Sequence, residues 1–509
     1  MRMSFFSGQK HLCLLIVVFL VAGCNIPVRA DGTSKNNRFT EVITVAQATG
    51  FEGFLPQDQE QPGQLVPEPT GTQVAASQGK SSPKKPAKKK SSPQSTRKSA
   101  AKILDEASKL PWPENVIKLA GAGAVLVVDN HTGDKEPQEL FSHNPDQPYV
   151  PASILKLVTS AAVLEAMGPD YRFVTDFYLA PPNDLWIVGR GDPFLVSEEI
   201  CIIAGELLSL GLKRIENIRL DTTFFEPGLI LDGTTYTNNA YDAFNTALAV
   251  NFNTVSYLID RKGKIVEFDE CTPLTPITVK LAEKNRPRKA PRQDKEFRIN
   301  ISSSPIEAEE QAGQLFLDIF KKFGIEVTGS VVIGGQLPSE ATPLYRHANS
   351  INLEELLVLL LENSNNFIAN QIFLTLGAEL YGPPATMEKG QKAIFAYLDR
   401  HNLDLLNLVE GSGLSRLNSL TARQMGNILA AFEPSIHLVK SEQDGSVFYK
   451  TGTMSDISTL AGYLIRPERP QEPISFVILL NGNYYPGTRE KILDVLKTRF
   501  IDQPVAGKS

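Results

Sequence analysis

Histidine and cysteine are scarce in this chain of 509 residues, which has six histidines and four cysteines. The histidines show no metal-ligand spacing, so the sequence predicts neither zinc nor another cofactor. Cys13 and Cys24 lie close to the N-terminus. For Cys201 and Cys271, a disulfide and a pair of buried free thiols are equally open from the sequence, because spacing along the chain does not fix a distance in space.

The apolar run near the N-terminus is short. It extends from Leu12 to Ala22, which is 11 residues, and follows the basic residues Arg2 and Lys10. A run of this length is too short to span a bilayer and is typical of a signal peptide. We therefore expect residues 1–23 to be a signal peptide and the protein to be exported.

The end of this run predicts a lipid anchor. The string Leu20-Val-Ala-Gly-Cys24 resembles the lipobox of bacterial lipoproteins. The resemblance implies cleavage before Cys24 and a membrane-anchored lipoprotein outside the cytoplasm. The alternative is ordinary cleavage after Ala30, which gives a soluble periplasmic protein.

A positive net charge is missing from most of the chain. Residues 1–102 hold 14 Lys/Arg and 6 Asp/Glu, a net charge of +8, whereas the whole chain has −6, so the remainder carries −14. An acidic body argues against nucleic-acid binding. Residues 24–102 are rich in Gln, Pro, Gly and Ser, and nine Lys/Arg without an acid lie between Lys80 and Lys102. This composition predicts a disordered basic linker.

The pattern beyond the linker predicts a catalytic domain in two pieces, 103–170 and 346–502, with an inserted region at 171–345 and a tail at 503–509. Hydrophobic periodicity predicts the individual elements. Strands are expected at Ala124–Asp129, Leu185–Val188, Val327–Ile333, Val447–Met454, Thr459–Ile465 and Ile474–Leu480, and helices at Ala101–Leu110, Leu157–Met167, Glu198–Leu210, Glu307–Phe323 and Thr488–Phe500.

One of seven Ser-x-x-Lys strings lies in a promising context. The other six fall in the signal segment or the basic linker, whereas Ser153-Ile-Leu-Lys156 opens an apolar helix. A spacing of three residues places both side chains on one helix face. A lysine desolvated there can serve as a general base for the serine. The alternative is a lysine whose ammonium extends to the surface.

Two further strings follow in the order that an acyl-transfer site needs. Ser364-Asn-Asn366 lies between two helical runs, where Ser364 either faces a cleft or caps a helix. Lys450-Thr-Gly452 occurs once, inside a predicted strand. Glycine weakens a strand and marks a place where another backbone comes close, which would suit a docked peptide.

Together these strings resemble the class C low-molecular-mass penicillin-binding proteins, which are D-alanyl-D-alanine carboxypeptidases/endopeptidases. The resemblance covers about residues 115–502 and implies an α+β, serine β-lactamase-like fold. In this fold an antiparallel sheet is flanked by helices, and a region is inserted between the first and second motifs. The strings are Pro151-Ala-Ser-Ile-Leu-Lys156, Val188-Gly-Arg-Gly-Asp-Pro193, Asn363-Ser-Asn-Asn-Phe367, Gly411-Ser-Gly-Leu-Ser-Arg416 and Lys450-Thr-Gly-Thr453.

The resemblance implies a serine DD-peptidase that acts on peptidoglycan stem peptides and binds β-lactam antibiotics. It assigns catalysis to Ser153, Lys156, Ser364 and Lys450, and substrate binding to Asn366, Thr451, Thr453 and Arg416. For Arg416, a surface salt bridge is the alternative. Some members bind the diaminopimelate branch through an acidic residue of the inserted region, and residues 235–241 offer no counterpart.

Three other functions fit parts of this pattern. A serine β-lactamase of class A type needs a deacylating glutamate after the second string. Glu226 precedes that string, and Glu410 adjoins Gly411–Arg416. A catalytically silent wall-binding lipoprotein would have no need of all four catalytic residues. Transpeptidation differs only in the acceptor.

Overall fold

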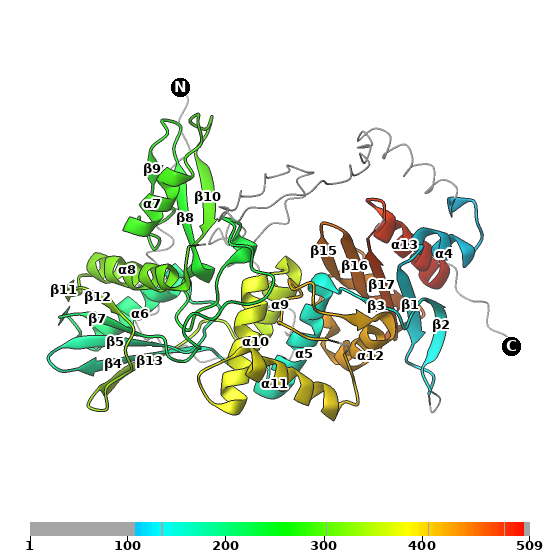
Figure 1. Cartoon of the computed structure of the whole chain (residues 1–509), viewed down its shortest axis with the longest axis horizontal. Helices are drawn as coiled ribbons and strands as arrows, with labels where there is room; N and C mark the ends of the chain where they lie inside the picture. Colours follow the sequence, from blue (N-terminus) through cyan, green and yellow to red (C-terminus); the bar gives the residue numbers. More distant parts are fainter. Residues whose placement is uncertain (1–106, 134–135, 302, 406, 483, 503–509) are drawn as a thin grey trace, which may run out of the picture.

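The structure is a computed structural model that describes residues 107–133, 136–301, 303–405, 407–482 and 484–502. Figure 1 shows a sheet at the C-terminal end of the molecule, a group of helices in the middle and a second sheet at the far side. The expected α+β class, with an antiparallel sheet flanked by helices, is confirmed. The signal peptide, Cys24, the basic linker, the tail and most of the expected helix Ala101–Leu110 lie outside the described residues.

The first sheet is antiparallel throughout and has the strand order β15-β16-β17-β1-β2. Alternate side chains of a strand point to opposite faces. Val125 and Val127 accordingly pack with α4 and α13, whereas Leu126 packs with α12. The bounds are β1 Ala124–Asp129, β2 Gln138–His143, β15 Val447–Met454, β16 Ile457–Arg466, β17 Arg469–Asn481, α4 Glu114–Ala120, α12 Ala422–Phe432 and α13 Thr488–Lys497.

The central helices form the largest apolar core. Helices α5 and α10 are apolar on nearly every side and are buried accordingly, as expected for α5 from the sequence. A 3₁₀ turn, Ala152–Leu155, leads directly into α5. A short bridge of β3 and β14 closes this part. The bounds are α5 Lys156–Met167, α9 Leu353–Asn363, α10 Asn366–Tyr381, α11 Met387–Arg400, β3 Pro148–Tyr149 and β14 Leu420–Thr421.

The segment between β4 and β13 builds a second, mixed sheet with the order β12-β7-β5-β4-β13. Helices α6 and α8 cover it, and their apolar side chains meet those of β4, β5 and β7 in a separate core. The bounds are β4 Val174–Ala180, β5 Asp184–Gly189, β6 Arg214–Ile215, β7 Ile218–Asp221, β11 Glu326–Val327, β12 Val331–Ile333, β13 Thr342–Ala348, α6 Ser197–Ser209 and α8 Pro305–Phe323.

The expected single strand Val327–Ile333 is wrong. The segment forms two short strands, β11 and β12, which pair with β6 and β7 respectively. Between them Gly329 lies tightly against the Glu216–Asn217 turn. A Cβ at Gly329 would lie 2.2 Å from the Asn217 side-chain oxygen. This contact diverts the chain, and an apolar pattern does not reveal it.

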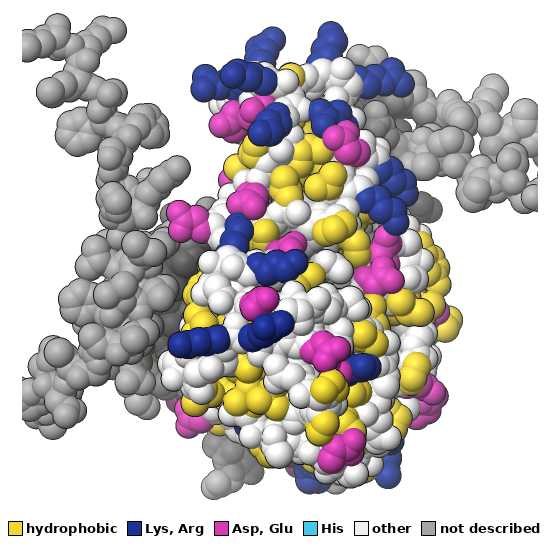
Figure 2. Space-filling model, turned by 90° about the vertical axis from the view of Figure 1, so that its left-hand side faces the viewer, with side chains coloured by type: hydrophobic (Ala, Val, Ile, Leu, Met, Phe, Trp, Pro, Cys, Tyr) yellow, Lys and Arg dark blue, Asp and Glu magenta, His cyan; other side chains and the backbone are white. Residues whose placement is uncertain are grey.

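Residues 254–301 form a lobe that rises beside the central helices (Figure 1). It combines the sheet β10-β8-β9 with helix α7 around a small core, in which the rings of Tyr257 and Phe297 stack. Lysine and arginine side chains gather at its outer end (Figure 2). The bounds are β8 Thr254–Ile259, β9 Ile265–Val266, α7 Pro276–Lys284 and β10 Lys295–Asn300.

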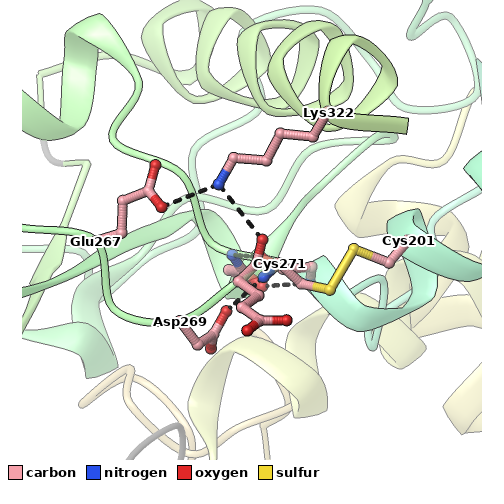
Figure 3. The surroundings of a disulfide bond; sticks show 8 residues. Cys201, Glu267, Asp269, Cys271 and Lys322 are labelled. Carbon is pink, nitrogen blue, oxygen red and sulfur yellow. Dashed lines mark hydrogen bonds and ion pairs between the residues drawn. A yellow bond between two sulfur atoms is a disulfide. The ribbon is translucent and has the colours of Figure 1, made fainter. Parts of the chain in front are cut away.

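A disulfide joins Cys201 of α6 to Cys271 at the base of the lobe, with the Cα atoms 6.3 Å apart (Figure 3). The structure thus decides a question that the sequence leaves open. Next to the bridge, the Lys322 ammonium of α8 donates to the Glu267 carboxylate at 3.0 Å and to the Glu270 carbonyl at 3.4 Å. These contacts join the lobe to the second sheet's helices.

The described residues hold no helix that is long and apolar enough to cross a membrane. The same residues contain no cluster of three or more His, Cys, Asp or Glu side chains that could hold a metal ion.

Candidate active site

Ser153 and Lys156 lie at the junction between the 3₁₀ turn and α5. Lys156 is fully buried, so its ammonium does not reach the surface. Its Nζ donates to Ser153 Oγ at 3.0 Å, Asn366 Oδ1 at 2.7 Å and the Ser412 carbonyl at 2.7 Å. These three acceptors match the three donors of an ammonium and fix Nζ beside the serine hydroxyl.

Ser364 joins α9 to α10 in a left-handed backbone conformation, with φ 55° and ψ 36°. It does not cap α10, because Asn365 Oδ1 accepts the Ile368 N–H instead. The Ser364 hydroxyl accepts a hydrogen bond from Lys450 Nζ at 2.8 Å. A kink between two helices thus presents this hydroxyl to the second lysine.

Lys450 and Gly452 lie on the edge strand β15, which packs against the turn that holds Ser153. A Cβ at Gly452 would lie 2.8 Å from the Pro151 carbonyl oxygen and 2.9 Å from the Ser153 nitrogen. The backbone that comes close to this glycine is therefore the protein's own turn that holds Ser153. The expected close approach of another backbone to Gly452 is confirmed, whereas the docking of a peptide along this edge stays a prediction.

Arg489 of α13 holds β15 in place by hydrogen bonds, and the sequence did not indicate this role. Its Nη1 donates to the Gly452 carbonyl at 3.2 Å, Thr453 Oγ1 at 3.3 Å and the Thr459 carbonyl at 3.1 Å. The three acceptors come from β15 and β16, so one guanidinium holds together the two strands beside Ser153.

Arg416 lies in the loop after Glu410 and forms an ion pair across to the β15–β16 turn. Its Nη2 donates to Asp456 Oδ1 at 2.6 Å and Ser455 Oγ at 3.0 Å, and both charged side chains are about half exposed. The alternative reading of Arg416 as part of a salt bridge is thus observed. The same arginine also borders the cleft described below.

Glu410 organises the loop that supplies an acceptor to Lys156, and the sequence pattern did not reveal this role. Its fully buried carboxylate accepts N–H groups from Ser412, Gly413 and Ser415. It also accepts the Ser412 hydroxyl at 2.5 Å and the Asn418 amide at 2.8 Å. Five donors converge on one carboxylate, and the loop that they fix aims the Ser412 carbonyl at Lys156.

A cleft of about 1230 Å³ opens over these groups. Its wall is made jointly by the central helices, β15 and the inserted region, whereas the two lysines lie behind the lining. Six of the eight expected site residues line it: Ser153, Ser364, Asn366, Thr451, Thr453 and Arg416.

The inserted region contributes two carboxylates to the cleft, Asp232 and Glu296. Asp232 accepts a hydrogen bond from the Ser415 hydroxyl. Glu296 lies on β10 and is exposed. Neither belongs to the segment 235–241, which has no acidic residue. No local sequence motif marks these two carboxylates, because only the fold brings them to the cleft.

Comparison with known proteins relates this chain to a family of peptidases. The sequence pattern of the D-Ala-D-Ala carboxypeptidase 3 (S13) family matches residues 118–438, a stretch that ends before Lys450. A D-alanyl-D-alanine carboxypeptidase from Actinomadura sp. (strain R39) is 30% identical over 436 residues, which cover 72% of this chain and 79% of the relative.

Two further likenesses come from Haemophilus influenzae. The D-alanyl-D-alanine carboxypeptidase DacB is 25% identical over 65% of this chain and 80% of its own length. The crystal structure of penicillin binding protein 4 (dacB) matches with a TM-score of 0.61 and 19% identity, and the match covers 77% of this chain and 99% of that structure. The structural match concerns the fold.

Proposed function

The chain belongs to the D-Ala-D-Ala carboxypeptidase 3 (S13) family and is a serine DD-peptidase, and from this premise we propose the residues that perform its reaction. The observation that carries the proposal is the 3.0 Å contact between Lys156 Nζ and Ser153 Oγ. Ser153 Oγ attacks the carbonyl carbon of the penultimate D-alanine of a stem peptide, and Lys156, in its neutral amine form, accepts the hydroxyl proton.

The strand β15 completes the site. The backbone N–H groups of Ser153 and Thr453 stabilise the negative oxygen of the tetrahedral intermediate, and each such donor typically contributes about 100- to 1000-fold to the rate. The tight packing of Gly452 against the Ser153 nitrogen supports this assignment, because it sets the two strings side by side.

The second string and Lys450 handle the leaving group. Ser364, whose hydroxyl accepts a hydrogen bond from Lys450 Nζ at 2.8 Å, passes a proton to the amine of the departing D-alanine. Thr451 and the Lys450 charge bind the terminal carboxylate, and Arg416 adds a positive charge at the cleft's edge. Asn366 accepts from Lys156 through Oδ1, and its amide nitrogen, which donates one hydrogen bond to the Tyr241 carbonyl at 3.4 Å, has a second N–H for the peptide carbonyl. Water then hydrolyses the acyl-enzyme.

Replacement of Ser153 tests the nucleophile. We expect Ser153→Ala to lose both D-alanine release from a muropeptide and covalent labelling by a fluorescent penicillin, because both need an ester at Oγ. Ser209→Ala, an exposed serine of α6, is the matched control and is expected to keep both. Labelling of the Ser153→Ala protein would refute the assignment. Products identified by mass separate loss of one alanine (carboxypeptidase) from dimer cleavage (endopeptidase).

A class A type of β-lactamase mechanism is disfavoured by the position of Glu410. Both oxygens of this buried carboxylate already accept hydrogen bonds within its own loop, so they are not free to activate water. We therefore expect the penicilloyl-enzyme to survive for minutes or longer. Rapid release of hydrolysed penicillin would favour the β-lactamase.

We also propose the cellular setting and the division of the chain. The protein acts outside the cytoplasm, where the Cys201–Cys271 disulfide persists, and Cys24 carries a lipid that anchors it to a membrane. Residues 103–170 and 346–502 form the catalytic domain, and 171–345 form the insertion. Palmitate labelling of Cys24→Ser tests the anchor, and labelling equal to that of the unaltered protein would leave the soluble periplasmic form.

A further inference from the structure

The outer end of the lobe carries a concentration of positive charge that the catalytic mechanism does not use. We define the basic tip as six exposed side chains on the β8–β9 turn, the last residue of α7 and the loop between α7 and β10. None of them forms an ion pair within the described part of the chain. The basic tip consists of Lys262, Lys264, Lys284, Arg288, Lys289 and Arg292.

Acidic groups at this end offset only a small part of the tip's charge. Glu283 pairs with Arg286, and Asp294 lies 3.8 Å from Arg261, so both acids are matched by arginines outside the defined set. Asp260 is the remaining acid, and its carboxylate accepts the backbone N–H groups of Lys262 and Lys264. Figure 2 shows the resulting group of basic side chains at the top of this face.

The two parts of the tip form one surface. The Arg286 guanidinium donates to the Gly263 carbonyl, which fixes the loop after α7 against the β8–β9 turn. A Cβ added at Gly263 would lie 3.5 Å from Ala290 Cβ, in ordinary contact. The charges are therefore presented together, on a body whose residues 103–509 carry a net charge of −14.

The same two strands that carry the tip also form a wall of the cleft. Ser256 of β8 and Glu296 and Arg298 of β10 line the cleft, whereas Lys295 begins β10 and pairs with Ile259. A strand advances about 3.3 Å per residue, and Arg292 precedes Arg298 by six residues, so the tip begins within roughly 20 Å of Arg298 along the chain. A polymer that enters the cleft therefore passes close to the tip.

We propose that the basic tip binds carboxylates of peptidoglycan stem peptides that neighbour the peptide in the cleft. This inference rests on the proposed function, since it takes the peptidoglycan strand as the substrate. Peptidoglycan repeats stem peptides with free carboxylates, which a group of unpaired cations attracts, whereas the net negative charge of the body as a whole disfavours them. A bilayer against the tip would lie within about 20 Å of the cleft and would obstruct the polymer.

A charge-neutral variant tests the proposal. The variant replaces Lys284, Arg288, Lys289 and Arg292 by glutamine, and all four side chains are exposed. The matched control replaces four exposed lysines elsewhere, namely Lys118, Lys213, Lys321 and Lys440. Co-sedimentation with purified sacculi, stripped of attached polymers, gives the affinity. A soluble tripeptide that ends in D-Ala-D-Ala reports on the catalytic site separately.

The tip variant is expected to bind sacculi at least about tenfold more weakly, because each Lys or Arg near an anionic surface contributes roughly fivefold. The control variant and turnover of the soluble tripeptide are expected to stay unchanged. Amidation of the sacculus carboxylates is expected to abolish the difference between the unaltered protein and the tip variant. Raised salt is expected to reduce it, since exposed charges are screened.

Three results would overturn the proposal. The first is equal binding of sacculi by the tip variant and the unaltered protein. The second is a difference that persists after amidation, which would mean that the tip does not bind carboxylates. The third is loss of binding to vesicles of anionic phospholipid with sacculus binding intact, which would make the tip a membrane contact. If the unaltered protein does not turn over the soluble tripeptide, the proposed function fails, and the sedimentation result still decides the role of the tip.

Discussion

At the scale of single residues, Gly452 links the third string to the nucleophile by its lack of a side chain. Its Cα faces the Pro151 carbonyl, the Ser153 nitrogen and Thr459 Oγ1, and a Cβ would approach the last of these to 2.3 Å. Two of these three neighbours are backbone atoms, which cannot rotate away as a side-chain end can. Any larger residue therefore moves the strand or the serine.

We predict that Gly452→Ala lowers the rate of acylation by penicillin about 100-fold or more, because a displacement of about 1 Å at a reacting group has an effect of this size. Stopped-flow labelling with a fluorescent penicillin measures it. Gly205→Ala in α6 is the matched control, because no heavy atom lies within 4 Å of its added Cβ. The control is expected to acylate normally. An unchanged rate in Gly452→Ala would show that the turn and the strand tolerate separation.

Glu410 acts on Lys156 through the loop that it holds. We predict that Glu410→Gln destabilises the protein by about 2–4 kcal/mol and slows acylation, because a glutamine nitrogen faces donors where a carboxylate oxygen accepted them. Thermal unfolding and the acylation rate are both measured. Glu226→Gln removes an exposed carboxylate and is expected to change neither. If Glu410→Gln acylates at the unaltered rate, the loop that Glu410 holds does not affect the function of Lys156.

At the scale of elements, Glu198 in the first turn of α6 makes the free energy of unfolding depend on pH. Burial, followed by the nearby Asp269 carboxylate, raises the pKa of Glu198 from 4.5 to about 7. Burial likewise raises the pKa of Glu309 in α8 to about 7 and that of Asp192 to about 6. Each carboxyl group therefore keeps its proton in the folded state at a pH where the unfolded chain releases it.

The sign follows from this difference. Stability from Glu198 is fully present below about pH 4.5 and is lost as the pH rises through about 7. We predict that Glu198→Gln raises the free energy of unfolding at pH 8 by about 1–2 kcal/mol relative to the unaltered protein, with little gain at pH 4. Urea unfolding at several pH values measures it. Glu206→Gln, exposed on the same helix, is the control. A gain independent of pH would assign the effect to packing instead.

Elements and local motifs were largely predictable, whereas their long-range partners were not. The bounds of β15 were predicted as observed, and the spacing of Ser153 and Lys156 follows from one helical turn. The break at Gly329, the brace from Arg489 and the loop around Glu410 depend on contacts between distant parts of the chain. A periodic pattern reports which face of an element is buried, and it does not name the neighbour.

At the scale of the whole molecule, the groups that we propose for catalysis and the groups that border the rest of the cleft come from different parts of the chain. The former lie on the central helices and β15, whereas Asp232 and Glu296 come from the inserted region. Glu296 forms no ion pair within the described residues and lies on the lobe that the disulfide joins to α6. An exposed carboxylate at the wall of a cleft attracts an amine of the substrate.

We predict that Glu296→Gln lowers kcat/KM about fivefold for a stem peptide with a free amine on its third side chain, since a partly exposed charge pair contributes about 1 kcal/mol. The same peptide with that amine acetylated is expected to react equally with both proteins. Glu270→Gln, exposed on the same lobe outside the cleft, is the matched control. Equal losses on the free and acetylated peptides would mean that Glu296 shapes the cleft without binding the amine. A loss confined to the free amine would assign substrate selection to the insertion, because the residues proposed for catalysis are assigned only to the peptide bond and its terminal carboxylate.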